Sequence, residues 1–240
     1  HSKLKVEGAE DPSQTLGMSL EYNVSGVIVT SDTPPQSLCQ ECITLGVPMV
    51  LVNKAESATD VDRVLLDNHK SGVLAAITLY ESGAREMAFV TTEHPSYSLN
   101  VRIASFIKQC EKLGLTPVTQ LTGKLQNYQG GMSACGQYLT KHRTVDGVFC
   151  VSDYMALGFL DGLRLNGPVE VPAQMKVISC DDIPQASWPI YELTTIRQDT
   201  HKLAVVVVDV LQERIKQPNN PAAVKILDVE LVHRNSTATV

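Results

Sequence analysis

Short apolar runs of strand length alternate along the chain with longer segments in which apolar residues recur every three or four positions. The runs predict strands at residues 3–6, 24–30, 49–52, 63–66, 87–91, 117–121, 147–151 and 175–180. The longer segments predict helices at 11–22, 35–45, 69–82, 99–113, 127–141 and about 153–166. Strands that alternate with helices pair in parallel through helical crossovers, so the pattern predicts an α/β fold built on doubly wound parallel sheets.

Four consecutive valines at 205–208 have the composition of a strand. Polar residues flank them at spacings of three and four, however, and this periodicity favours a buried helix over residues 200–216. The sequence Pro-Asn-Asn-Pro at 218–221 then predicts a surface turn.

Polar side chains follow two of the predicted buried strands. Ser152 and Asp153 come after 147–151, where Asp153 is expected to cap the next helix, and Asp181 and Asp182 come after 175–180. Ligands of open α/β sheets bind at the carboxyl ends of the strands, so this edge is the candidate site. Arg102, early in a predicted helix, offers a planar fork of donors to a hydroxyl pair or a carboxylate, although taken alone it is typical of a solvated helix arginine.

Composition and charge argue against several classes of function. The net charge of −6 argues against a nucleic-acid surface on this chain, no apolar run reaches the length of a membrane span, and no signal-peptide pattern is present. The six cysteines are scattered, mostly in apolar periodic segments, and predict reduced, buried thiols of a cytoplasmic protein. The Cys39–Cys42 pair lacks the second pair that a zinc site needs, so we expect it to pack on a helix. The chain carries no nucleotide-binding, nucleophile-elbow or zinc-protease motif, which indicates that it is not an enzyme and has no cofactor or bound metal.

Several segments resemble one family in their order and spacing. They are S-D-Y-M-A-L-G at 152–158, D-D-I-P-Q-A at 181–186, L-T-T-I-R-Q-D at 193–199, L-V-H-R-N-S-T at 231–237, V-S-G-V-I-V at 24–29, and D-N at 67–68 with the following glycines at 72 and 83. Together they resemble the effector-binding core of LacI/GalR transcriptional regulators, and the likeness covers nearly the whole chain.

The resemblance implies two similar lobes of the periplasmic-binding-protein type I fold, joined by three chain crossings. The N-terminal lobe would comprise 1–66 plus 200–223, and the C-terminal lobe 67–199 plus 224–240. Such regulators begin with a DNA-binding headpiece and a first strand and helix that this sequence does not show. We therefore expect further residues before His1, and an unpaired edge on the strand at 24–30 where the first strand would lie.

The resemblance also implies a set of ligand-binding positions. They are Asn53, Arg102, Leu125, Ser152, Asp181 and Gln198. Asp181 would accept hydrogen bonds from the effector, and Asp182 would cap the local turn. Leu125 stands where the family commonly has an aromatic residue that stacks on a sugar or base, a departure that puts a sugar effector in doubt.

The function implied is an effector-binding and dimerisation domain. A small polar molecule, a sugar or similar metabolite, would bind between the lobes and control DNA binding allosterically. The partners would be that effector, operator DNA through a headpiece not in this chain, and a second copy in a homodimer, with no membrane. The alternatives are a periplasmic-type solute-binding protein of the same fold and an enzyme on a doubly wound sheet.

Overall fold

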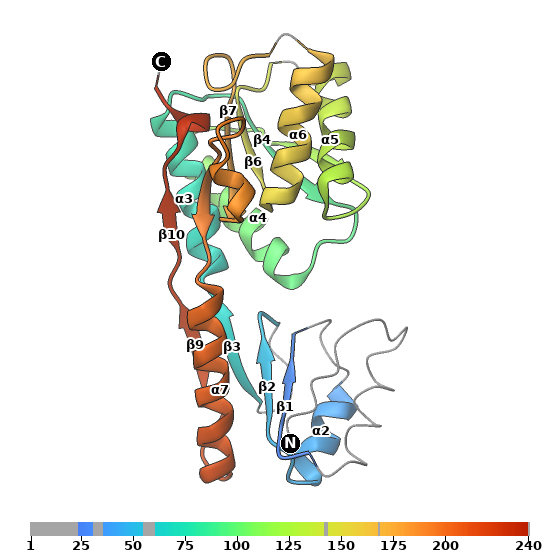
Figure 1. Ribbon diagram of the computed structural model, residues 1–240, viewed down its shortest axis with the longest axis vertical. Coiled ribbons are helices and arrows are strands. Elements are labelled where there is room, and N and C mark those ends of the chain that lie inside the picture. The colour runs from blue at the N-terminus through green and yellow to red at the C-terminus, as the bar shows by residue number, and fades with distance from the viewer. Residues whose placement is uncertain (1–23, 31–35, 55–60, 142–143, 168, 240) are drawn as a thin grey trace. The chain divides into compact units, whose positions relative to one another are not determined.

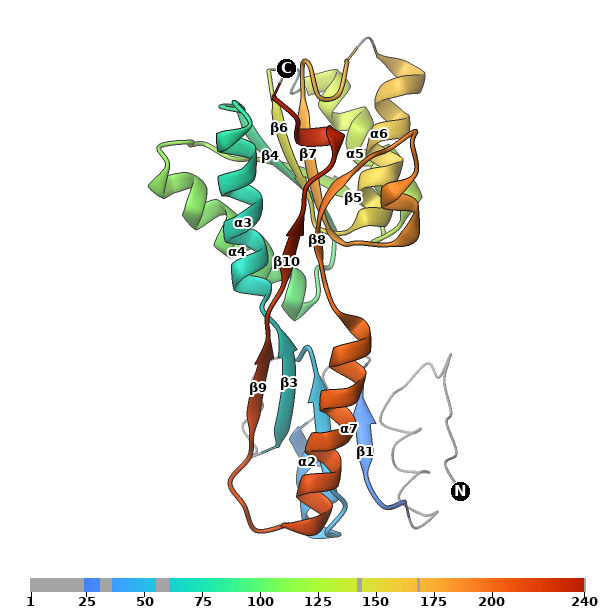
Figure 2. The ribbon, with the colours of Figure 1, turned by 60° about the vertical axis from the view of Figure 1, so that its left-hand side comes forward.

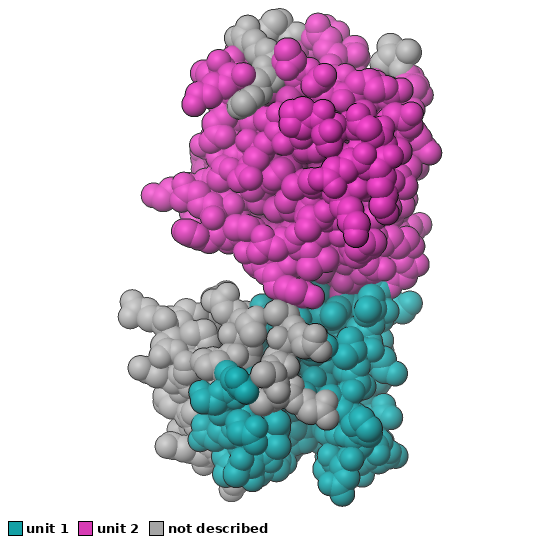
Figure 3. All heavy atoms as spheres, turned by 180° about the vertical axis from the view of Figure 1, so that it is seen from behind, with its two compact units in different colours: residues 1–65, 200–227 teal, residues 66–199, 228–240 magenta. Residues whose placement is uncertain are grey.

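The computed structural model describes residues 24–30, 36–54, 61–141, 144–167 and 169–239 (Figure 1). The chain forms two compact units, coloured separately in Figure 3. Unit 1 comprises 1–65 and 200–227, and unit 2 comprises 66–199 and 228–240. The chain therefore passes from one unit to the other three times, and the third passage falls later than the residue near 223 where the resemblance placed it.

Unit 1 contains a four-stranded sheet in the order β1 (Val27–Val29), β2 (Met49–Val52), β3 (Asp62–Leu66) and β9 (Val224–Leu227). Alternate residues of β2 face opposite sides of it. Met49 and Leu51 pack in one cluster with Cys39 and Cys42 of α2 (Gln36–Thr44), while Val50 and Val52 pack in another with valines of α7 (Thr200–Lys216). A helix on each face explains why the whole of β2 is apolar.

Unit 2 contains a six-stranded sheet in the order β10 (Glu230–Val232), β8 (Thr194–Arg197), β7 (Lys176–Asp181), β6 (Gly147–Cys150), β4 (Met87–Thr92) and β5 (Thr119–Gly123). Only the β8–β10 pairing is antiparallel. Two short 3-10 helices, η1 (Pro184–Ser187) and η2 (Asn235–Thr237), follow β7 and β10.

Paired helices cover the two faces of this sheet. Helices α3 (Asn68–Glu81) and α4 (Tyr97–Lys112) pack together on one side, and α5 (Tyr128–Lys141) and α6 (Asp153–Asn166) on the other (Figures 1 and 2). The core between them contains Phe106, Phe149 and Phe159, all fully buried. The sheet is thus covered on both faces, and its strand ends are left to carry polar groups.

Most of the predicted elements are confirmed, and so is the fold class. The helix at 200–216 is present despite its valine run, because Val207 and Val210 supply the buried face. The predicted strand at 117–121 lies slightly later, as β5. The predicted elements at 3–6 and 11–22 lie outside the described residues, so the pairing of strand 24–30 on its outer side is untested; among the described residues β1 pairs with β2.

Gly72 sets how closely α3 approaches α4. A Cβ atom at this position would collide with the backbone oxygen of Arg102 and come within 2.7 Å of the backbone nitrogen of Phe106. Because glycine has no side chain, the backbones of α3 and α4 pack directly against each other at Arg102.

We predict opposite effects for the same substitution at two glycines of unit 2. Gly72→Ala should lower the free energy of unfolding by about 1–3 kcal/mol, because the added methyl forces the helix backbones apart. Gly136→Ala should raise it by about 0.5–1 kcal/mol, because Gly136 lies exposed in α5 with nothing within 4 Å of the added atom. Urea denaturation followed by circular dichroism measures both, and a Gly72→Ala protein as stable as Gly136→Ala would contradict this packing.

Candidate functional site

The order of strands in unit 2 reverses between β4 and β6. The chain leaves β4 for β5 at one edge of the sheet and then continues from β6 towards the other edge. The loops after β4 and β6 therefore diverge, and a crevice at the carboxyl ends of such strands is where doubly wound sheets bind ligands. Two buried hydroxyl oxygens lie at this edge. They are Oγ1 of Thr91, the second-last residue of β4, and Oγ of Ser152, two residues after β6, and neither has a hydrogen-bond partner within the described structure.

Arg102 lies beside this switch point and is buried among protein groups, although we expected it to line the pocket surface. The residue is only 5% exposed. Its Nε donates to Oδ1 of Asn68 at 2.7 Å, and its Nη1 donates to the carbonyl of Val151 at 2.8 Å. The guanidinium is thus held in a fixed orientation at the end of β6, with donors remaining beyond these two bonds. Removing it would also strip two buried acceptors of this donor, so Arg102→Ala should lower the free energy of unfolding as well as remove the candidate ligand donors.

Asp181 ends β7 and faces Arg102. A carboxylate oxygen of Asp181 lies 3.7 Å from Nη1 of Arg102, closer than the ~10 Å that marks one ligand diameter. The same oxygen accepts a hydrogen bond from Nε2 of Gln198 at 3.1 Å. The backbone of Asp181 has φ of 130°, which a residue with a side chain rarely adopts. Strain of this kind persists where surrounding contacts impose it, and it is common in ligand sites.

Burial raises the pKa of Asp181 to about 7, although the charge of Arg102 opposes this shift. The side chain remains 32% exposed, so water reaches the carboxyl group and moderates the effect of burial. Asp181 is therefore a carboxyl group whose charge changes near neutral pH at the edge of the sheet.

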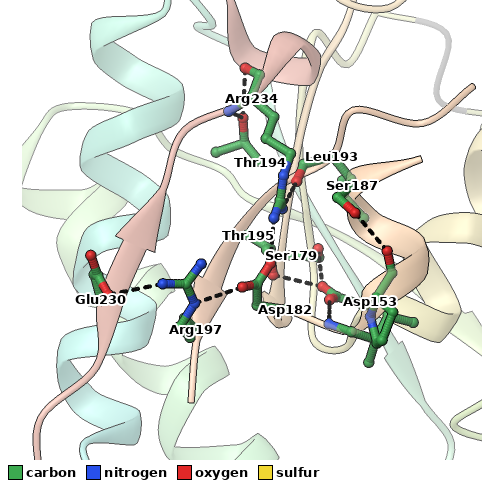
Figure 4. Close-up of polar contacts among 12 residues, drawn as sticks. Asp153, Ser179, Asp182, Ser187, Leu193, Thr194, Thr195, Arg197, Glu230 and Arg234 are labelled. Carbon is green, nitrogen blue, oxygen red and sulfur yellow. Dashed lines mark hydrogen bonds and ion pairs between the residues drawn. The ribbon is translucent and has the colours of Figure 1, made fainter. Parts of the chain in front are cut away.

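Asp182 is ion-paired on both sides and does not serve as the predicted turn cap. Its two oxygens accept hydrogen bonds at 2.7 Å from Arg197 and from Arg234 (Figure 4). Arg197 also lies 3.3 Å from Glu230. Burial would raise the pKa of Asp182, but the hydrogen bonds from the two arginines outweigh it and lower the pKa. These contacts hold the backbone just after Asp181, where Asp182 itself has φ of 58°.

Asp153 holds the loop that follows Asp181 by accepting a hydrogen bond from its backbone. It is the first residue of α6 and fully buried, and Ser152 rather than Asp153 occupies the N-cap position. Its carboxylate accepts hydrogen bonds from the hydroxyls of Ser179 and Thr195 and from the backbone N–H of Ile183 (Figure 4). The predicted N-cap role is wrong: Asp153 instead joins β7, β8 and the loop after Asp181.

The structure brings together some of the predicted residues. Arg102, Asp181 and Gln198 are in contact, and Ser152 directly follows Val151, whose carbonyl binds Arg102. Leu125 is 59% exposed in the loop after β5. Asn53 belongs to unit 1, where it has φ of 54° at the end of β2. Ligand binding by any of these residues remains a prediction.

Sequence reasoning missed two contributors to the site. The sequence predicts no role for Asn68 beyond its place in the motif at 67–68, and it predicts Thr91 only as the last residue of a strand. The signal for Thr91 was available, since it lies at the carboxyl end of β4 as Ser152 lies beyond β6. The role of Asn68 depends on the packing of α3 against α4, which no local pattern encodes.

Two cavities lie away from this edge of the sheet in the described structure. A shallow cavity of about 390 Å³ lies between α6 and residues 169–173, and a smaller one lies against Asp62 and Arg214 in unit 1. Neither cavity is lined by Arg102 or Asp181, and the smaller one contains a different ion pair, in which Nε of Arg214 lies 2.8 Å from the carboxylate of Asp62. The candidate site is therefore chosen for its position at the switch point and its polar groups, and not for its concavity. No group of three or more metal-binding side chains occurs within the described ranges, and no helix there has the length and apolar character of a membrane span. All six cysteines are buried, as predicted.

Known proteins share both the sequence and the fold. The family described as periplasmic binding protein-like domain matches residues 76–237. The HTH-type transcriptional repressor PurR of Glaesserella parasuis serovar 5 (strain SH0165) is 27% identical over 236 residues, or 95% of this chain and 69% of that repressor. PurR of Actinobacillus pleuropneumoniae serotype 3 (strain JL03) is 29% identical over 205 residues, or 84% and 60%. The chain thus spans about two thirds of the length of these curated relatives.

Among solved structures, a LacI family transcriptional regulator from Enterococcus faecium with bound ribose has a TM-score of 0.84 and 25% identity, covering 94% of this chain and 84% of that one. The complex of the transcriptional regulator CelR with cellobiose has a TM-score of 0.83 and 25% identity, covering 93% and 69%.

The chain belongs to the family of periplasmic binding protein-like domains. The parallel sheets, the polar switch point and the relatives agree on this class. Within it, the chain is an effector-binding core of the LacI type, as its motifs predicted.

Asp181 and Asp182 should respond to pH in opposite directions. Because the pKa of Asp181 is raised above 3.8, its proton stabilises the folded state at low pH, and that stability is lost as pH rises through about 7. The pKa of Asp182 is lowered, so its contribution is present at neutral pH and is lost as pH falls below 3.8. We predict that the Tm gain of Asp181→Asn over the unsubstituted protein grows between about pH 4 and pH 7, whereas Asp182→Asn stays less stable than the unsubstituted protein over the same range.

Thermal melts at several pH values decide this, with Glu93→Gln, an exposed carboxyl change near the same edge, as the control. A Tm difference for Asp181→Asn that does not change with pH would contradict the burial of this carboxyl group.

Proposed function

We propose that this chain binds a small hydroxyl-rich molecule at the Arg102–Asp181 edge of unit 2 and thereby controls the DNA binding of a transcriptional regulator. One observation carries the proposal: opposite charges lie 3.7 Å apart at a sheet switch point, beside two buried hydroxyls with no described partner. Buried polar groups without partners cost free energy, so a ligand that satisfies them gains affinity there.

The donor and acceptor pattern fits vicinal hydroxyl groups. Arg102 offers donors in a plane, Asp181 accepts when ionised, and the hydroxyls of Thr91 and Ser152 can do either. A sugar hydroxyl both donates and accepts, so neighbouring hydroxyls can bridge the guanidinium and the carboxylate. The relatives solved with ribose and with cellobiose support this class of effector.

Leu125 bears on the size and shape of the effector. An exposed aliphatic side chain has no π face on which a flat ring could stack. The missing platform counted against a sugar in the sequence, but hydroxyls that bind at Arg102 and Asp181 need no ring to stack on Leu125. We therefore propose a compact polyol, recognised by its hydroxyls, over a flat nitrogen base.

DNA control enters the proposal through the relatives, which are HTH-type repressors. The net charge of −6 opposes a DNA surface on these residues, so we assign operator contact to a headpiece that they do not include. The effector would act by binding one arrangement of the units better than another. The repressor relatives favour this function over that of a solute-binding protein, and they favour a regulator over an enzyme.

We predict saturable, calorimetrically measurable binding of D-ribose to the full chain. Asp181→Asn and Ser152→Ala should each weaken it about tenfold or more, because hydrogen bonds to charged or buried groups are worth about 1.5–3 kcal/mol. Glu93→Gln is the control and should bind normally. Cellobiose tests a larger sugar, and adenine a flat ring. Tight adenine binding without binding of either sugar would contradict the polyol effector.

We also propose a homodimer that uses an exposed aromatic patch of unit 2. Trp188 is 51% exposed and Ile190 is 60% exposed. Trp188 stacks on Tyr191, whose hydroxyl donates to Asp161, while Arg164 pairs with the same carboxylate. Tryptophan, tyrosine and arginine around an apolar centre are the residues enriched in protein interfaces.

In light scattering after gel filtration, the unsubstituted chain should have twice its monomer mass. Ile190→Asp should shift the protein to monomer, because a buried, unpaired carboxylate at an interface is costly. Ile226→Asp, at a 62% exposed position of unit 1, is the matched control and should leave the mass unchanged. A dimer that survives Ile190→Asp would place the interface elsewhere.

A further inference from the structure

Asn68 connects the candidate site to the backbone of β3. It is the first residue of α3 and only 5% exposed. Its side-chain oxygen accepts the hydrogen bond from Nε of Arg102 at 2.7 Å, and its side-chain nitrogen donates to the carbonyl of Leu66 at 3.1 Å. One amide group thus joins the guanidinium to the main chain two residues earlier.

This amide is not needed to start the helix. Asp67 is the N-cap of α3, and its carboxylate accepts from the backbone N–H of Lys70 at 2.8 Å. The capping requirement of the first turn is therefore met without Asn68. Its two hydrogen bonds serve Arg102 and Leu66.

Leu66 lies where the chain passes between units. It is the last residue of β3, and the first passage falls between residues 65 and 66. Gln198, which binds Asp181, lies next to the second passage, between residues 199 and 200. Arg102 is therefore hydrogen-bonded to Asn68, near the first passage between units, and Asp181 to Gln198, near the second.

We propose that Asn68 is a positioning residue that transmits a change at Arg102 to the backbone at Leu66. The inference rests on the proposed function, because an effector that engages Arg102 is what would supply the change. When a ligand accepts a hydrogen bond from the guanidinium, the strength of the Nε bond to Asn68 changes and the amide adjusts to it. The hydrogen bond from this amide to the carbonyl of Leu66, a buried residue, then weakens or strengthens.

The chemistry of the amide makes this transmission testable. An amide has one acceptor and two donors, whereas an ionised carboxylate only accepts and an aliphatic side chain does neither. Asn68→Asp therefore keeps the acceptor for Arg102 and removes the donor to Leu66. Asn68→Leu removes both, and Thr78→Ala, at a buried polar position of the same helix, touches neither link.

The first experiment needs no ligand. Arg102→Lys keeps the positive charge but lacks Nε, and NMR records the carbonyl ¹³C shift of Leu66 in the full chain. We expect Arg102→Lys to move this signal in the unsubstituted and Thr78→Ala backgrounds, and the displacement to fall about twofold or more in Asn68→Asp. The Nε–H signal of Arg102 should stay protected from exchange in Asn68→Asp and lose protection in Asn68→Leu.

The second experiment uses D-ribose as the probe. Ribose should displace the Leu66 carbonyl signal in the unsubstituted chain, with at least a twofold smaller displacement at saturation in Asn68→Asp. Failure of ribose to bind the unsubstituted chain would count against the polyol effector alone. An equal response of Leu66 to Arg102→Lys with and without the Asn68 amide would overturn the transmission proposal, as would unchanged Arg102 Nε–H protection in Asn68→Leu.

Discussion

The pairing of Arg102 with Asp181 is the interaction on which the rest of the site depends. A guanidinium that is almost fully buried needs acceptors, and here Asn68, Val151 and Asp181 surround it. These residues come from α3, the end of β6 and the end of β7, so the charge fixes three elements relative to one another. The geometry holds the arginine firmly and leaves its carboxylate partner at a longer distance, open to a competing ligand.

The strained turn at Asp181 follows from the same constraint. Two consecutive aspartates have positive φ, a conformation that costs free energy for residues other than glycine. Asp182 is held by two arginines, and Asp153 holds the backbone of Ile183. The neighbouring carboxylates thus have separate tasks, one to fix the loop and one to face the edge of the sheet. Burial raises the pKa of Asp181, whereas the hydrogen bonds from the two arginines lower the pKa of Asp182.

The sequence predicted the elements better than the side-chain environments. Periodicity located α7 correctly because polar residues flank its valines at helical spacing, and the alternation of strands and helices predicted the parallel sheets. It could not show that Arg102 is buried, since burial there depends on Gly72 bringing α3 against α4. Nor could it separate Asp182 from a turn cap, because Arg197 and Arg234 reach it from β8 and from beyond β10.

The central claim is that an effector binds where β4, β6 and β7 end. Titration of the ¹⁵N-labelled chain with D-ribose, followed by NMR, measures this residue by residue. We expect the largest backbone amide shifts at Thr91, Ser152 and Asp181. Saturable shifts concentrated instead around the cavity at 169–173, with these three residues unmoved, would contradict the claim.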